Sequence, residues 1–522
     1  MDILQLILVL LLVAVMLAAL ARQIGVPSPS LLALGGVTVA LIPNGPRFTL
    51  QPDLALALFV APVLLDAAFD SPLRDLRRNW FPVTCLVIIL VALTTIVVAM
   101  VAHWMMPAMP FAVCLTLGAL VAPPDAAAAS AVLGEINLPH RLLVVLEGES
   151  LLNDASALLI YRMAVAAALM NGGDKLHFAS TLGLVLVGSI AFGIAMAFVF
   201  SELLARFPDA PSSIVIQFIG AFGVWILADR LGFSGVLAIV SFAIILSRRS
   251  GIRMPAAVRV PSYAVWETAV FVLNALAFVM IGLQLEPIVM RIELGQRYEG
   301  LRFAGMILLS VIGVRAAWML FYNGALRTLG RMLRDGAPGW MPIPPWKGSI
   351  LGAWCGMRGI VTLAAALALP DGSGGTVAFP YRDVILLAAF TVVIGTLVIQ
   401  GLTLRAFAIA LNLESDDTVE LETRSGRAQI IRAAIDSLDS FDDDVAGTIR
   451  AELISTLARL QGESALTDAN DFEYDLRTNA RRAARESLTH LRLTGVIGDE
   501  SFQRLEAELD MIELDTDMRR RW

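Results

Sequence analysis

The chain has 522 residues, of which 57% are hydrophobic and only 16% are charged, and its mean hydropathy is +0.74. Ordinary soluble domains are about 45–50% apolar and about 25% charged, so this composition excludes that class and indicates a membrane protein. The net charge of -7 is divided unevenly, because residues 413–522 carry -11 and the residues before them carry +4. No basic cluster of the kind that binds nucleic acid is present. The sequence therefore predicts two domains, a transmembrane domain over 1–412 and an acidic, water-soluble tail over 413–522.

Apolar runs of nearly bilayer length recur from Ile3 onward. In the bilayer core such runs must be helical, because nothing there satisfies an open backbone. The first run, residues 3–20, has no basic segment before it, so we interpret it as a spanning helix, although an uncleaved signal anchor has the same pattern. The fold class is thus all-α, with about thirteen transmembrane helices. Their expected ranges are 3–21, 29–43, 53–69, 81–106, 111–133, 141–170, 180–205, 212–229, 233–248, 263–287, 302–328, 347–370 and 383–411.

The basic residues between these spans predict the orientation of the chain. Loops after odd-numbered spans hold 14 Arg and Lys residues, whereas loops after even-numbered spans hold 7. Basic loops stay in the cytoplasm. We therefore expect a multi-pass protein of the cell inner membrane, with its N-terminus outside and its C-terminal tail in the cytoplasm.

Two of the expected spans are interrupted. The fifth contains Pro123 and Pro124 next to Asp125, and the twelfth contains glycines at 352, 356 and 359 around Arg358. The two spans are seven apart, so they run in opposite directions. Interrupted helices in matching positions of inverted halves are typical of a transporter's midplane site. Simple kinking or close packing is the alternative, but a charge at each break favours the transporter.

A polar cluster, Glu147 to Asp154, lies inside the apolar run of the sixth span, where an ionised group is costly and usually functional. Asp154 and Asp125 are the carboxylates that we expect to bind a dehydrated monovalent cation. Ser150 is four residues before Asp154, on the same helix face, and can add a hydroxyl oxygen. Asp66, in the third span, is a further candidate. Burial favours the neutral form of a carboxylate, so a proton and a cation can compete for one charge, and that competition permits obligatory exchange.

Glu149 has a different expected role. Arg358 stands in the broken twelfth span and needs an anionic partner. We expect Glu149 and Arg358 to form a structural ion pair between the two crossing segments. Glu147 faces elsewhere on the helix and is the alternative partner of this arginine, or else it lies in a cytoplasmic vestibule.

Five segments together resemble a known family. They are FVAPVLLDAAFD at 59–70, APPDAAAASAVL at 122–133, EGESLLND at 147–154, WETAVFVLNALAFVMIGLQL at 266–285 and WCGMRGIVTLAAALALP at 354–370. The chain resembles the monovalent cation:proton antiporters of the group that includes bacterial NhaP-type proteins and the animal sodium/proton exchangers. The matching segments follow one another in order across the membrane domain.

The resemblance implies thirteen helices in two inverted repeats with crossed broken helices, a homodimer, and elevator-like alternating access. It implies electroneutral exchange of sodium or lithium for a proton, with the cation as substrate and no cofactor. Asn153 and Asp154 match the family's Asn-Asp pair, whose Asp carries ion and proton in turn. Asp125 and Ser150 match positions that help to hold the cation, and Asp66 stands where the family often has Glu. Glu149 and Arg358 match its helix-bridging ion pair.

One departure bears on the choice of cation. Many family members have Thr-Asp-Pro at the first break, whereas this chain has Pro-Asp-Ala at 124–126. Potassium/proton antiport therefore stays open as an alternative. Other classes are an intramembrane aspartyl hydrolase using Asp125 and Asp154, and a passive cation channel or membrane sensor. We expect a transporter and not an enzyme, because the hydrolase would need a Gly-x-Gly-Asp element that the chain lacks, and there is no pore-loop pattern.

The tail shows helical apolar spacing at Ile449, Leu453, Leu457 and Leu460, and again near Leu505, Leu509 and Ile512. Glycines at 495 and 498 indicate a turn. A small helical bundle is expected there, with either a regulatory role or a role in folding and assembly.

Overall fold

The computed structural model describes residues 3–42, 56–69, 71–125, 129, 133, 138–169, 175–290, 297–332, 344–371, 378–413, 418–438 and 444–461. Within these ranges the regular structure is helical and no strand occurs, which confirms the all-α fold class. The chain divides into two compact units, Met1–Asp416 and Asp417–Trp522. The boundary lies four residues after the end predicted for the transmembrane domain.

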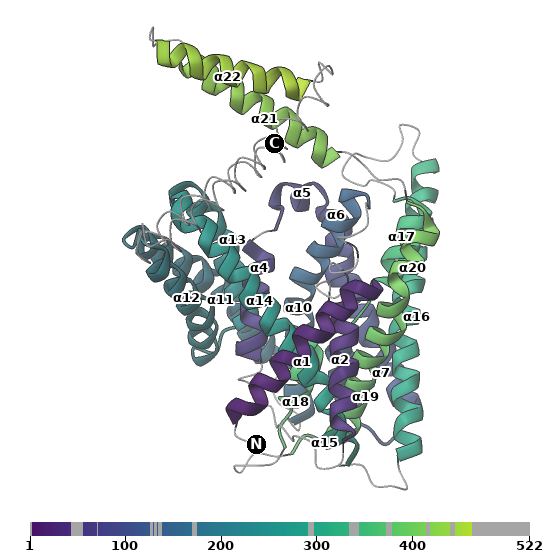
Figure 1. Ribbon diagram of the computed structural model, residues 1–522. Coiled ribbons are helices and arrows are strands. Elements are labelled where there is room, and N and C mark those ends of the chain that lie inside the picture. The colour runs from purple at the N-terminus through teal and green to yellow at the C-terminus, as the bar shows by residue number, and fades with distance from the viewer. Residues whose placement is uncertain are drawn as a thin grey trace. The chain divides into compact units, whose positions relative to one another are not determined.

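Every expected span of the first unit corresponds to helical structure (Figure 1). The first half comprises α1 (Ile3–Ile24), α2 (Ser28–Ala40), the π-helical turn η1 (Leu56–Val60) with α4 (Ala61–Phe69), the short α5 (Leu73–Arg78), α6 (Trp80–Thr84) with η2 (Cys85–Leu90) and α7 (Val91–Met105), α8 (Phe111–Val121), and α10 (His140–Leu169). The second half comprises α11 (Lys175–Ala205), α12 (Ala210–Arg230), α13 (Gly235–Arg253), α14 (Ala256–Leu283), α15 (Leu285–Met290), α16 (Arg297–Met332), α17 (Trp346–Trp354), α18 (Ile360–Leu367), and α19 (Arg382–Thr396) with η5 (Leu397–Gly401) and α20 (Leu402–Leu411).

Among the described residues, six helical stretches are long and apolar enough to cross a membrane. They are Trp80–Met105, Gly183–Ala205, Ala210–Arg230, Ala257–Met290, Arg297–Met332 and Arg382–Leu411. Shorter apolar helices precede and accompany them, including α2 and α8. The two spans predicted to be broken are indeed discontinuous: α8 ends at Val121, and residues 355–359 separate α17 from α18. Most of the expected continuation of α8, residues 126–137, lies outside the described residues.

The interior of the first unit holds two large groups of buried apolar side chains. One joins α1, α2, α7, α8 and α14 to α16–α20. The other joins α4 to α11, α12 and α13. In the first group α2 and α14 approach closely at two glycines: a β-carbon on Gly36 would meet the Val279 carbonyl, and one on Gly282 would meet the Ala33 carbonyl. Small residues allow membrane helices to pack at this range.

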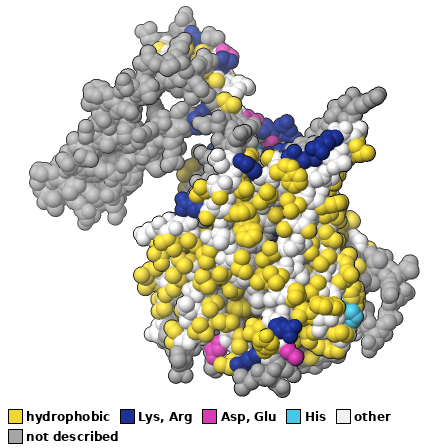
Figure 2. Space-filling model, turned by 90° about the vertical axis from the view of Figure 1, so that its right-hand side faces the viewer, with side chains coloured by type: hydrophobic (Ala, Val, Ile, Leu, Met, Phe, Trp, Pro, Cys, Tyr) yellow, Lys and Arg dark blue, Asp and Glu magenta, His cyan; other side chains and the backbone are white. Residues whose placement is uncertain are grey.

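The outer surface of the first unit is apolar. Figure 2 shows one face covered by hydrophobic side chains, with arginine and lysine side chains gathered toward its upper edge. Large apolar side chains on this unit are widely exposed, such as Trp104 at 74% and Leu184 at 72%. A monomeric soluble protein rarely exposes so much contiguous apolar surface. The surface is that of a protein embedded in lipid.

The second unit contains two described helices, α21 (Thr418–Ser437) and α22 (Asp444–Gln461), which pack against each other. The predicted helical run from Ile449 to Leu460 falls within α22, so helix at this place is confirmed. The second predicted run, around Leu505, Leu509 and Ile512, and the predicted turn at Gly495 and Gly498 lie outside the described residues.

Candidate functional site

Helix α10 carries most of the polar residues singled out from the sequence. Its helical period sends them to different surroundings: Glu149, Asn153 and Asp154 are buried, with exposed fractions of 1%, 0% and 8%. Ser150 is half-buried and Glu147 is exposed. Burial of three polar side chains within two turns of one helix is costly unless each finds a partner. Their partners therefore define the site.

The two helix breaks meet each other. The backbone N–H of Asp125, just after Pro123 and Pro124, donates a hydrogen bond of 2.7 Å to the carbonyl oxygen of Met357 in the second break. A β-carbon on Gly359 would overlap the Asp125 carboxylate. Glycine is therefore the residue that allows this carboxylate to lie against the start of α18, where the positive end of a helix dipole favours a negative charge.

Helix α10 is tied to the first break by Asn153. Its side-chain amide nitrogen donates to the carbonyl oxygen of Pro124 at 3.1 Å. The amide oxygen of Asn153 has no hydrogen-bond partner among the described residues. Asn153 thus positions the break next to Asp154, the following residue on α10.

Arg358 occupies the second break and is 2% exposed. Its Nε donates to the carbonyl oxygen of Val121 at 2.7 Å, and Nη1 donates to the carbonyl oxygen of Gly356. Its backbone N–H donates to Oγ1 of Thr396 at 3.0 Å. The guanidinium therefore caps the end of α8, where the negative end of a helix dipole favours a cation.

The predicted ion pair between Glu149 and Arg358 is wrong in its partner. Glu149 instead pairs with Arg315 on α16, through two hydrogen bonds of 2.5 Å (Nη1 to Oε1) and 2.8 Å (Nη2 to Oε2). Arg315 Nε also donates to the carbonyl oxygen of Gly352 at 3.0 Å. The bidentate geometry satisfies both buried groups, whereas the donors of Arg358 go to carbonyl oxygens.

Arg315 is the residue that sequence reasoning left without a role. It is a single arginine in the apolar α16, and such a residue signals a buried partner without naming it. Gly356 packs directly against the Arg315 side chain, and a β-carbon at this position would crowd that side chain. The ion pair thus joins α10, α16 and the end of α17.

Four of the five residues predicted to bind the ion line a single cavity of about 320 Å³, between α4, α10, α14, α18 and the break that follows α8. Asp154 and Asp125 are on its wall with Ser150 and Asp66, while Asn153 lies behind it. The other polar side chains on its wall are Ser71, Glu147, Asn274 and Thr362. Such a space is large enough for several water molecules or for a partly hydrated cation.

The charges around Asp154 set what the cavity can bind. Asp125 is its like-charged neighbour and Arg358 its opposite-charged one. Asp125 and Asp154 share this cavity with the carboxylates of Asp66 and Glu147 and with nearby hydroxyl groups, and together they form the hard oxygen surroundings that suit a cation. The guanidinium of Arg358 offsets part of this negative charge. The excess of carboxylates over this single guanidinium favours a positively charged ligand in the cavity. Thr362 is a candidate oxygen that the sequence did not single out, and its only signal was its place just after the Gly359 break.

Comparisons with known proteins point the same way. The family model described as "Sodium/hydrogen exchanger, transmembrane" matches residues 8–410. The chain is 28% identical over 531 residues to "Uncharacterized Na(+)/H(+) exchanger YjcE" of Escherichia coli, which covers 94% of each chain. It is 27% identical over 535 residues to the "Sodium, potassium, lithium and rubidium/H(+) antiporter" of Bacillus subtilis, covering 98% of this chain and 78% of the relative.

A solved structure has the same fold. The "sodium proton antiporter MjNhaP1 from Methanocaldococcus jannaschii" matches with a TM-score of 0.59 and 18% identity, over 78% of this chain and 98% of that protein. At this identity the likeness establishes the fold and nothing finer.

Proposed function

Because the chain belongs to the sodium/hydrogen exchanger family, we propose that it is a secondary active antiporter that exchanges sodium or lithium for a proton. The observation that carries this proposal is the cavity at the crossing of the two helix breaks, where Asp154 and Asp125 meet.

Asp154 is the group that we assign to carry the exchanged charge. It is nearly buried, so its carboxylate needs a positive partner, and Asp125 adds a second negative charge to the same wall. A cation and a proton compete for this position, since each neutralises the same charge. Asp125, Ser150 and Asp66 supply further oxygens, and Asn153 holds the break in place through Pro124. Exchange of one cation for one proton at one carboxylate is electroneutral.

The way the cavity is built supports a proposal of alternating access. Its walls come from η1, α4 and α14, and from α10, α18 and the break that follows α8. Asn153 ties α10 to the first break, Arg358 ties the second break to the end of α8, and the Glu149–Arg315 pair ties α10 to α16. We propose that this group moves as one body past α4 and α14, so that the site opens to each side of the membrane in turn.

The choice of cation is the part of the proposal with a specific alternative. The printed name of the Bacillus subtilis relative includes potassium and rubidium beside sodium and lithium. This chain lacks a threonine hydroxyl before Asp125, where Pro124 stands. Proline offers only its carbonyl oxygen, and that oxygen accepts a hydrogen bond from Asn153. Potassium/proton exchange in the same cavity is therefore the alternative.

We place the protein in the cell inner membrane as a homodimer, with its N-terminus outside and its tail in the cytoplasm. The distribution of arginines between the loops supports the orientation. The apolar outer surface of the first unit supports the membrane location and contact with lipid. Thirteen crossings are consistent with this orientation, because an odd number places the two ends on opposite sides.

The test uses everted membrane vesicles from an antiporter-deficient bacterium that expresses the chain. The interior is acidified, and a pH-sensitive dye reports proton efflux when sodium, lithium or potassium is added. We expect efflux with sodium and lithium that Asp154→Asn abolishes while the protein stays in the membrane. Asp229→Asn is the matched control, because it makes the same chemical change at a carboxylate whose side chain is 60% exposed. That variant should behave as wild type.

Two outcomes would contradict the proposal. Efflux that persists in Asp154→Asn would remove that carboxylate from the exchange. A cation-driven current without proton movement would indicate a channel. A response to potassium that exceeds those to sodium and lithium would select the potassium/proton alternative.

A further inference from the structure

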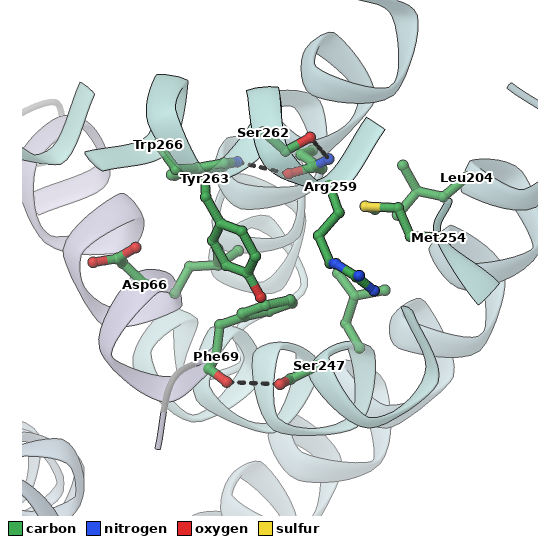
Figure 3. A pocket seen from close by; sticks show the side chains of 12 residues that line it. Asp66, Phe69, Leu204, Ser247, Met254, Arg259, Ser262, Tyr263 and Trp266 are labelled. Atoms are coloured by element: carbon green, nitrogen blue, oxygen red, sulfur yellow. Dashed lines mark hydrogen bonds between the residues drawn. The ribbon is translucent and has the colours of Figure 1, made fainter. Parts of the chain in front are cut away.

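A second pocket adjoins the ion cavity at Asp66 and shares no other lining residue with it. It has a volume of about 110 Å³ and is enclosed by α4, α11, α12, α13 and α14. Figure 3 shows its lining side chains converging from these helices. No element that contains a helix break contributes to it, so it belongs to the part of the fold that we propose to stay still during transport.

Most of the polar groups on its wall are already satisfied. Gln217 accepts a hydrogen bond of 2.8 Å from Nε1 of Trp266 and donates to the Ser262 hydroxyl at 3.2 Å. Ser262 donates in turn to the carbonyl oxygen of Val258. The Ser247 hydroxyl donates to the carbonyl oxygen of Phe69 at 2.6 Å. These groups stabilise the packing of α4, α12, α13 and α14, and they leave little capacity for a ligand.

Arg259 is different. It is half-buried, and its side chain makes no hydrogen bond or ion pair with any part of the chain that the structure describes. Figure 3 shows it extending from α14 into the space between Tyr263 and Met254. A guanidinium that has lost part of its water and has no acidic partner is costly. Its planar fork of donors suits carboxylate, sulfonate or phosphate.

Apart from Asp66, which also lines the ion cavity, the rest of the lining is apolar. Phe69, Leu204, Leu246 and the ring of Tyr263 surround the space in front of Arg259. Cavities of about 150 Å³ admit a benzene ring, so this smaller one takes a short alkyl segment. A ligand that fits must therefore combine one anionic group with a narrow apolar chain.

We propose that this pocket binds an amphipathic anion, with its anionic group on Arg259 and its alkyl chain against Phe69 and Leu204. Two sources share this chemistry, an anionic membrane lipid and a free amphipathic anion. Arg259 lies in the first turn of α14, close to the end of that membrane-length helix. The anionic group bound by Arg259 could then come either from a lipid head group or from the water.

Occupancy of this pocket acts on the ion cavity through Asp66, which lines both. A negative charge on one side of this carboxylate makes a positive charge on its other side more favourable. Bound anion should thus lower the cation concentration that gives half-maximal exchange by about two- to fivefold, an electrostatic effect of under roughly 1 kcal/mol at an effective dielectric constant near 20. This coupling rests on the proposed antiport, whereas binding to the pocket does not.

Binding is measured by calorimetry on the full chain in phosphatidylcholine nanodiscs, with 1-hexanesulfonate as the probe and hexyltrimethylammonium as the control of opposite charge. Arg259→Gln should weaken sulfonate binding at least tenfold. Arg249→Gln is the matched control: that arginine lies on the neighbouring α13, donates to Ser201 and packs on the Phe198 ring. It should leave binding unchanged. Leu204→Phe keeps Arg259 but fills the apolar space, and it should also weaken binding.

Equal binding to wild type and Arg259→Gln would overturn the proposal, as would equal binding of the two probes. If Arg259→Gln does not fold, the Leu204→Phe result decides, and unaltered binding there would overturn it. Nanodiscs with anionic lipid identify the source: loss of sulfonate binding in them indicates that lipid occupies the pocket, and unchanged binding indicates a free anion. Binding without any effect on exchange would refute the coupling alone.

Discussion

The buried pair of Glu149 and Arg315 offers the sharpest test of how this fold is held together. Both side chains are 2% exposed, and two charge-assisted hydrogen bonds join them. Glu149→Gln keeps the shape of the side chain and removes its charge, so it leaves Arg315 buried without a counter-ion. Removing one partner of a buried pair costs about 3–5 kcal/mol.

This cost converts to a shift in melting temperature. Unfolding entropy is roughly 2.1 cal/mol/K per residue. The first unit, Met1–Asp416, therefore has an unfolding entropy of about 0.9 kcal/mol/K. A loss of 3–5 kcal/mol therefore lowers the melting temperature by about 3–6 °C. The measurement heats the detergent-solubilised protein and records the monodisperse fraction by gel filtration.

The double variant Glu149→Leu with Arg315→Met separates the pair from the rest of the packing. Two apolar residues of similar volume leave no buried charge, so most of the lost stability should return. The remaining deficit should be about 1 kcal/mol, for the lost hydrogen bond to Gly352. Asp229→Asn, which removes a charge from a side chain that is 60% exposed, is the control and should not change the melting temperature. A single variant as stable as wild type, or a double variant no better than the single, would refute the reasoning.

Three further predictions concern single positions. Gln400 is fully buried in η5, and neither of its amide atoms has a hydrogen-bond partner among the described residues. Gln400→Met should raise the melting temperature by about 1–3 °C, because an unmade buried hydrogen bond costs about 1–3 kcal/mol. A lower melting temperature would contradict this. Gly359→Ala should reduce dye-reported exchange at least tenfold without loss of membrane insertion, because its β-carbon would displace the Asp125 carboxylate; wild-type rates would show that this contact is dispensable. The hydrogen bond to His140, at 3.1 Å, holds the pKa of Asp75 below its ordinary value of 3.8. The stability that the ionised Asp75 contributes is present above pH 3.8 and is lost as the pH falls through the lowered pKa. Asp75→Asn should therefore lower the melting temperature near neutrality, and the difference from wild type should shrink in acid. A difference that grows in acid would contradict this prediction.

Several elements were predictable because their signal is local. The apolar runs are long, and only a helix satisfies a backbone in lipid, so the predicted spans match the helices in position. The breaks at Pro123 and Gly359 were also predictable from the sequence, because proline lacks a backbone N–H donor and glycine allows close approach of other groups. The helical period also predicted that Ser150 and Asp154 lie on the same wall of the cavity.

The contacts between distant segments depended on the tertiary structure. Glu149 and Arg315 are 166 positions apart, and the pattern of the sequence predicted Arg358 as the partner of this carboxylate. Packing decided the partner: the Arg358 guanidinium lies against the Val121 carbonyl at the end of α8, and the Glu149 carboxylate lies against Arg315. The position of Asp66, which joins the ion cavity to the pocket at Arg259, depends likewise on how α4 packs against α13 and α14. The sequence by itself determined which segments are helices, where they break and which of them carry charge. Which charges meet was decided only when the helices packed, because a helical period fixes the face on which a residue lies but not the neighbour on that face.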